Sequence, residues 1–149
     1  MIHFMRPFHI IALMLLLSGF AQAQTSQPAL IDASDKAALT AHLGQDVFVH
    51  GVISTAEWSR TGAVMNIEFK NNQQSRMLAV VFQRNKAKLD EAYGGDLAKT
   101  LTGARVRIHG KLEEYGGQVA SMKGRPQIII NIGAQITIYE LAPASGRGN

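Results

Sequence analysis

Aromatic and basic residues occur together between the apolar segments of this sequence. Trp58 is followed closely by Arg60, and Tyr115 by Lys123 and Arg125. Aromatic rings stack on nucleic-acid bases and cationic side chains bind phosphates, so this mixture suits single-stranded nucleic acid. The alternative is that Trp58 covers one end of the domain and that the loop arginines are merely solvated. The candidate nucleic-acid-binding set is Trp58, Arg60, Arg76, Phe82, Arg84, Arg107, Tyr115, Lys123 and Arg125.

A second basic pattern has a period of two residues. Basic side chains alternate with small or apolar ones at Arg105, Arg107, His109 and Lys111. In a strand, such a row lies on one face. It could contact phosphates, or it could be the solvated side of an antiparallel strand. Glu113 and Glu114 follow the row with opposite charge, which favours the solvated face.

Catalytic chemistry finds little support in the sequence. No cysteine is present, which excludes disulfides, thiolate metal sites and a cysteine nucleophile. The 11 acidic residues are scattered rather than clustered as a calcium-dependent nuclease would need. His50 and His109 could lie on adjacent strands, but no third metal ligand is placed beside them. We therefore predict a protein that is not an enzyme and holds no metal or cofactor.

The periodicity predicts a β-rich domain. A short helix capped by Ser34 and Asp35 is followed by a strand with a bulge or bend at Gly51. The run 77–82 is apolar at every position, as expected for a strand that is covered on both faces. The expected elements are a helix at 36–43, strands at 46–57, 65–69 and 77–82, a helix at 85–102 interrupted at 94–95, and strands at 105–112 and 127–138.

This order predicts an all-β fold, the five-stranded OB-fold Greek-key barrel. Three strands, a helix between strands 3 and 4, and a closing pair of strands are the elements of that barrel, here with an additional short N-terminal helix. The helix should plug the bottom of the barrel with Leu89, Tyr93, Leu97 and Leu101. A β-sandwich would need about seven strands, and only five are expected.

Four segments, at 44–53, 77–82, 101–111 and 124–131, resemble the bacterial nucleic-acid-binding OB-fold family. That family includes anticodon-binding-type OB domains and accessory OB modules of secreted nucleases. The most specific piece is Gly124-Arg125-Pro126-Gln127-Ile128. The resemblance implies a ligand face framed by the loops between strands 1 and 2 and between strands 4 and 5. Residues 117–122 are extra relative to the family pattern in the second of these loops.

The N-terminus predicts export. Arg6 precedes a short apolar run that ends in Ala21-Gln22-Ala23, the pattern of a cleavable secretory signal, and the run is too short for a membrane span. The expected boundaries are a signal peptide at 1–23, a flexible leader at 24–33, the OB-fold domain at 34–140 and a disordered tail at 141–149. Arg6 is the only one of the 15 basic residues in the signal, so 14 remain against 11 acidic residues.

Two functions follow as hypotheses. The first is an exported, periplasmic or secreted, non-enzymatic OB-fold protein that binds single-stranded DNA or RNA weakly and without strong sequence preference. The second is a periplasmic scaffold domain that binds a protein or a small ligand on the same barrel. The mildly basic charge permits either partner. Glu68 lies on the outward side of the second strand, where its charge would repel phosphates.

Overall fold

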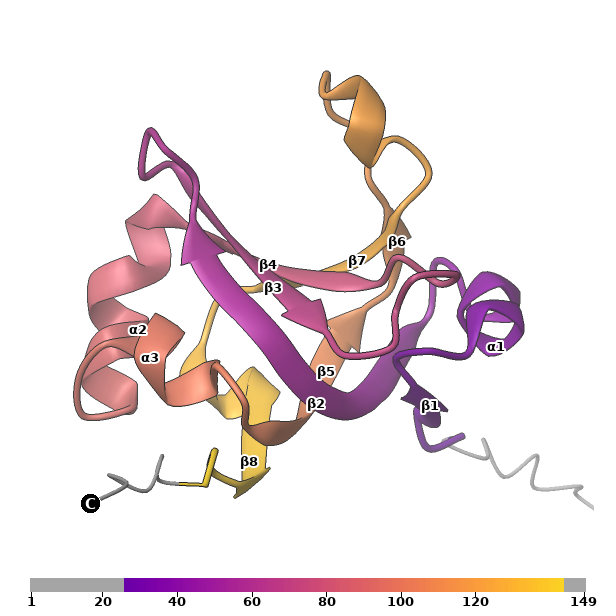
Figure 1. Cartoon of the computed structure of the whole chain (residues 1–149). Coiled ribbons are helices and arrows are strands. Elements are labelled where there is room, and N and C mark those ends of the chain that lie inside the picture. The colour runs from indigo at the N-terminus through magenta and orange to yellow at the C-terminus, as the bar shows by residue number, and fades with distance from the viewer. Residues whose placement is uncertain (1–25, 144–149) are drawn as a thin grey trace, which may run out of the picture.

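A computed structural model describes residues 26–143, so the predicted signal at 1–23 and most of the predicted tail lie outside the described residues. Strands curve around one core, with α2 and α3 at one end and α1 at the other (Figure 1). Between residues 26 and 143, no helix has the length and apolarity needed to cross a bilayer. The elements are β1 (Ala29–Asp32), α1 (Lys36–Ala41), β2 (Asp46–Trp58), β3 (Val64–Phe69), β4 (Leu78–Phe82), α2 (Lys86–Ala92), α3 (Leu97–Leu101), β5 (Arg105–Lys111), β6 (Glu113–Glu114), β7 (Pro126–Ile130) and β8 (Ile136–Glu140), with short 3-10 helices at Gln83–Asn85, Ala120–Met122 and Gly133–Gln135.

The strands form a closed barrel with the order of an OB-fold, as predicted. The sheet runs β6-β7-β4-β3-β2-β5-β8, and β4 and β7 are parallel. β6 follows β5 after Leu112 and pairs with β7, which closes the barrel. β2 is shared, because residues 46–52 pair with β5 and residues 53–58 pair with β3. A long first strand that serves both halves is what lets five strands close a barrel.

The strand pairing of β2 is interrupted beyond Gly51, the residue at which the sequence predicted a bulge or bend. The register between β2 and β3 shifts between Ile53 and Thr55. Gly51 has another role: a Cβ there would lie 2.9 Å from the Phe69 ring, so its bare backbone lets that ring pack against the curved strand. The sequence predicted the bend correctly and placed the register shift wrongly, because a glycine needed for close packing and one that marks a bulge give the same signal.

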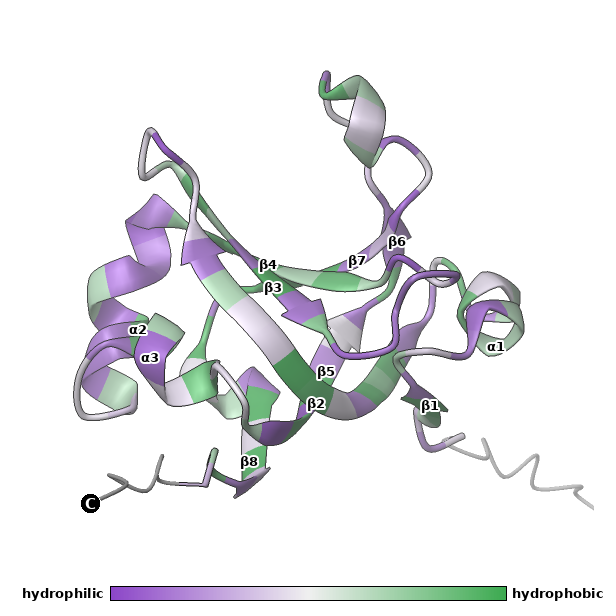
Figure 2. Ribbon diagram, in the orientation of Figure 1, coloured by the Kyte–Doolittle hydropathy of each residue, from purple (hydrophilic) through white to green (hydrophobic). Residues whose placement is uncertain are grey.

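The barrel interior is filled by alternate side chains of every barrel strand. Met65, Ile67 and Phe69 point inward from β3 and are fully buried. The helical segment closes one end as predicted, since Leu89, Leu97 and Leu101 are buried in the same core. The hydroxyl of Tyr93 lies 2.7 Å from the carbonyl oxygens of Gly133 and Ile136, which joins the plug to the C-terminal strand. Figure 2 shows the apolar residues concentrated on the strands that line this core.

The predicted flexible leader at 24–33 is wrong for its second half. Residues 29–32 form β1, which pairs in parallel with β2 from Ala29↔Val47 to Asp32↔His50. Ile31 and Ala33 are buried in the barrel core, and their burial stabilises the short strand. Four residues are too few to show a period, so the pattern did not reveal the strand.

The predicted fifth strand at 127–138 is two strands. β7 ends at Ile130, a 3-10 turn follows, and β8 then pairs with β5 outside the five-stranded barrel. The side-chain oxygen of Gln135 accepts hydrogen bonds from the backbone N–H groups of Asn131 (2.7 Å) and Ile132 (3.1 Å). This local side-chain contact turns the chain within an isoleucine-rich run that otherwise resembles one continuous strand.

Candidate nucleic-acid interface

The outer face of β3, β4 and β7 carries a groove. Directly paired residues of neighbouring strands point to the same face, so Val64 and Phe82, and Asn66 and Val80, lie side by side on the outside of the barrel. A cavity of about 310 Å³ lies over them. We call it the groove; its main lining residues are Val64, Asn66, Val80, Phe82, Tyr115 and Met122.

The wall of the groove is the β6–β7 loop, residues 115–125. In Figure 1 this loop stands out from the barrel above the concave side of β3 and β4. Val80 points outward yet is only 5% exposed, and it lines the groove together with Tyr115 and Met122 of the loop, so the loop covers this face. The prediction that 77–82 is covered on both faces is therefore confirmed. The extra residues 117–122 form part of this wall.

Tyr115 is held against its own loop. A Cβ on Gly117 would lie 2.4 Å from the Tyr115 hydroxyl oxygen, so the ring occupies the space that any other side chain at 117 would need. The Val119 N–H donates to the same hydroxyl oxygen over 3.4 Å. These contacts fix the ring before any ligand arrives, which lowers the entropy cost of stacking a base on it.

Arg125 anchors the loop instead of offering a free charge. Its Nη2 donates to Glu68 Oε1 at 3.1 Å and its Nε donates to the Arg76 carbonyl oxygen at 2.9 Å. The side chain is only 12% exposed. Arg76 in turn donates to the Ser121 carbonyl oxygen in the same loop. Arg76 and Arg125 therefore position the wall of the groove, and Glu68 pairs with Arg125 on the outer face of β3.

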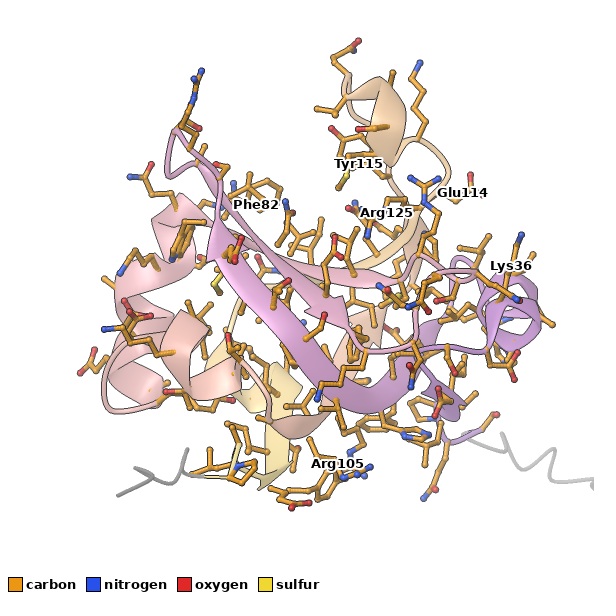
Figure 3. All side chains as sticks on the ribbon, in the orientation of Figure 1. Lys36, Phe82, Arg105, Glu114, Tyr115 and Arg125 are labelled. Atoms are coloured by element: carbon orange, nitrogen blue, oxygen red, sulfur yellow. The ribbon has the colours of Figure 1, made fainter. Side chains whose placement is uncertain are left out.

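Phe82 and Arg84 form a cation–aromatic pair at the groove. The guanidinium carbon of Arg84 lies 4.7 Å from the centroid of the Phe82 ring, which lines the groove. Arg84 is exposed and makes no ion pair with a described residue, so its charge is available to a ligand. Figure 3 shows Phe82 and Tyr115 on the same side of the sheet, with Arg125 at the base of the loop.

Trp58 does not belong to the groove. It pairs with Met65, whose side chain is inside the barrel, so Trp58 also faces the barrel side of β2. Lys86 of α2 lies 5.9 Å from its ring centroid. Glu68, which binds Arg125, points to the opposite face of β3 from Met65 and lies about 10 Å further along that strand. Trp58 and Arg125, both members of the candidate binding set, therefore do not share one cleft, and Trp58 covers the helical end of the barrel.

The remaining candidates divide between two faces. Arg60 is exposed in the turn that ends at Val64, and Lys123 is exposed on the β6–β7 loop, so both lie on segments that border the groove. Arg107 projects from β5 on the other side of the barrel, where its guanidinium carbon is 4.7 Å from the Phe48 ring centroid. The structure therefore gathers Phe82, Arg84 and Tyr115, with Arg76 and Arg125 supporting them, and separates Trp58 and Arg107.

Sequence reasoning missed the apolar floor of the groove. Val64, Val80 and Met122 were not among the candidates, because they carry neither an aromatic ring nor a charge. One signal could have identified Val80: a strand covered on both faces needs a second covering element. The long loop after Glu114 was a segment without an assigned partner that could supply it. Within residues 26–143, no group of three or more potential metal ligands is present.

Comparison with known proteins supports the architecture. No family model and no curated protein matches the chain. Over 83% of its length, the chain is similar to a protein described as an aspartyl-tRNA synthetase from Leishmania major Friedlin, with a TM-score of 0.52 and 11% identity. The likeness establishes the fold. The matched region spans only 23% of that synthetase.

Two further solved structures are more distant. An asparaginyl-tRNA synthetase from Entamoeba histolytica matches with a TM-score of 0.49 and 12% identity over 79% of this chain and 24% of that chain. A protein described as a nucleic acid-binding lipoprotein from Klebsiella pneumoniae matches with a TM-score of 0.34 and 13% identity over 70% of this chain and 78% of that chain.

Proposed function

We propose that this protein binds single-stranded nucleic acid in the groove. The observation that carries the proposal is the position of Phe82 and Tyr115. Both rings line a cavity of about 310 Å³ on the outer face of the second and third barrel strands, where OB-folds bind oligonucleotides. Stacking of one base on such a ring contributes about 1–3 kcal/mol. The fold likeness to a protein described as a tRNA synthetase supports the same ligand class.

The chemistry of the groove favours weak binding without strong sequence preference. Of its side chains only Asn66, Gln127 and the Tyr115 hydroxyl can hydrogen-bond to a base edge, so few positions would distinguish one base from another. Stacking tolerates any base, because every base has a π-face. Arg60, Arg84 and Lys123 are exposed cations on segments that border the groove, and three phosphate contacts predict a slope of about −2 in log K against log salt.

In this function the protein is exported and does not act as an enzyme. The secretory pattern at residues 1–23 supports a periplasmic or secreted location. A passive binding role accords with the scattered acidic residues of the sequence. A barrel of this kind would hold or protect single strands without cutting them. Incubation of the purified protein with plasmid and calcium or magnesium tests this part, because strand cleavage would contradict it.

Fluorescence anisotropy with a labelled single-stranded oligonucleotide of about 10 nucleotides tests the binding itself. Tyr115→Ala and Phe82→Ala should each raise Kd about tenfold, since each removes one stacking surface. Lys99→Gln is the control: this exposed lysine lies on α3, away from the groove, and its loss should leave Kd unchanged. An unchanged Kd in both aromatic variants would reject the groove as the site.

A protein or small-ligand partner is the second candidate. It is favoured by the apolar floor of Val64 and Val80 and by the pairing of Arg125 with Glu68, which removes one positive charge from the groove. An apolar peptide would fill such a groove without needing phosphates. Absence of saturable oligonucleotide binding at low salt, from a protein with an intact thermal transition, would favour this candidate over the first.

A further inference from the structure

A row of stacked side chains lies on the outer face of β2, β5 and β8. The His109 ring lies 4.5 Å from the Phe48 ring, with 26° between their planes. The guanidinium carbon of Arg107 lies 4.7 Å from the centroid of Phe48 and 5.6 Å from that of Tyr139. We call Phe48, Arg107, His109 and Tyr139 the stacked row. The period of two along β5 places Arg107 and His109 outside while Val106 and Ile108 enter the core.

The charge of Arg107 is not compensated. Its neighbours on β5 each have a carboxylate: Arg105 lies 3.6 Å from Glu140, and Lys111 lies 3.7 Å from Glu113. Arg107 has no carboxylate within 4.0 Å among the described residues. Two aromatic rings hold its guanidinium plane instead. A cation fixed in this way is pre-organised for an anion, because its rotamer freedom has already been lost on folding.

Hydrogen bonding points to the same row. Within residues 26–143, the buried side-chain nitrogen and oxygen atoms that lack a hydrogen-bond partner are Arg107 Nε and His109 Nε2. Buried polar atoms are normally satisfied, and leaving one unpaired costs about 1–3 kcal/mol. Ring stacking, not hydrogen bonding, therefore fixes both side chains. Their hydrogen-bonding capacity is unused by the part of the protein that the structure describes.

A second cavity lies between this row and the groove. Between β5 and β7 lies a seam cavity of about 460 Å³, lined by Arg84, His109 and Lys111 and by the carboxylates of Asp46 and Glu113. His109 belongs to both the seam cavity and the stacked row. Arg84 borders the seam cavity and covers Phe82 in the groove. The seam cavity therefore brings Arg84, which covers a groove residue, and His109, a member of the stacked row, to one surface, where two cations face two acids.

We infer that a single strand bound in the groove continues across the seam cavity and contacts the stacked row, with a phosphate on Arg107 and a base on Tyr139. This inference rests on the proposed function.

The Tyr139 side chain is 55% exposed, so its ring can receive a base. Figure 3 shows Phe82 and Tyr115 above the sheet and Arg105, the neighbour of the row on β5, below it. The strand would wrap around the barrel. Aromatic rings interleaved with an unpaired cation suit a nucleic-acid strand better than an acidic protein surface.

A length series separates the row from the groove. Oligonucleotides of about 5 nucleotides would fill the groove alone, and those of about 16 would reach the row. The unmodified protein should bind the long strand at least about tenfold more tightly, because the row adds one stacked base and one phosphate contact. Arg107→Gln and Tyr139→Ala should each remove part of this gain for the long strand and leave the Kd of the short strand unchanged.

The controls make each failure distinct. Lys99→Gln removes an exposed positive charge on α3 and should leave the Kd values of the short and the long strand unchanged. Thermal melting checks that each variant is folded. Equal affinity for both lengths in the unmodified protein would overturn the inference and leave the proposed function intact. An equal rise in Kd for the short and the long strand in Arg107→Gln and Tyr139→Ala would also overturn the inference. Failure of the short strand to bind at all would reject the proposed function first.

Discussion

Arg125 on the β6–β7 loop lies 3.1 Å from Glu68 on β3, and this ion pair joins the wall of the groove to its floor. Arg125→Gln should free the loop, because it removes the ion pair and disturbs the bond to the Arg76 carbonyl. Amide hydrogen exchange should accelerate across 115–125 with little change in the barrel core. Glu68→Gln should do the same more weakly, and unchanged exchange in both variants would show that the loop is held by other contacts.

Gly117→Ala should weaken oligonucleotide binding about as much as Tyr115→Ala. A Cβ at 117 would lie 2.4 Å from the Tyr115 hydroxyl oxygen, so the ring must leave its position beside the groove. Gly116→Ala is a matched control, since a Cβ there meets nothing within 4 Å. Anisotropy titration of the two variants checks the prediction, which fails if both bind equally well.

Ile31→Ala should destabilise the protein by about 2–5 kcal/mol, the usual cost of truncating a buried isoleucine. Ile31 is 3% exposed in β1, whereas its neighbour Leu30 is 62% exposed. Leu30→Ala should therefore change the free energy of unfolding by no more than about 0.5 kcal/mol. Urea denaturation of both variants compares them directly. Equal, small effects would mean that β1 contributes nothing to the barrel.

Asp90 should support the junction of α2 and α3 only when it is ionised. The hydrogen bond from Lys86 at 2.5 Å, and then the bond from the Leu97 N–H at 3.0 Å, lower the pKa of Asp90 below its ordinary 3.8. A lowered pKa means that the contribution is complete above pH 3.8 and disappears as the pH falls through the folded-state value. Asp90→Asn should lower Tm at pH 7 and should cost little at the acidic end of a pH series. A constant difference in Tm across that series would contradict the pKa assignment.

The barrel could be predicted from the sequence because its signals are regular. Met65, Ile67 and Phe69 alternate with polar residues, and Leu89, Leu97 and Leu101 recur with a helical period, so strand and plug follow directly. The turn at Gly133–Gln135 could not be predicted, because its cause is the Gln135 side chain returning to the backbone of Asn131. A single contact of this kind does not change the hydrophobic periodicity of the sequence.

The site was harder to predict because position in a loop does not fix the direction of a side chain. Trp58 and Tyr115 are both aromatic residues beside a turn, yet pairing with Met65 directs Trp58 toward the barrel and Gly117 directs Tyr115 toward the groove. Arg125 was expected to meet a ligand, and the carboxylate of Glu68 holds it instead. Both outcomes depend on partners that are distant in the sequence.

The barrel is closed by β6, whose two residues pair with Pro126 and Gln127, and the next bond joins the Tyr115 N–H to the Arg125 carbonyl at 2.9 Å. The base of the β6–β7 loop thus continues the pairing that closes the barrel. Moving the base of the loop aside would break the β6–β7 pairing that closes the barrel, so we expect the base of the loop to stay in place when a ligand binds. Association with a ligand should then follow a single kinetic phase that scales with ligand concentration, with no slow opening step before it.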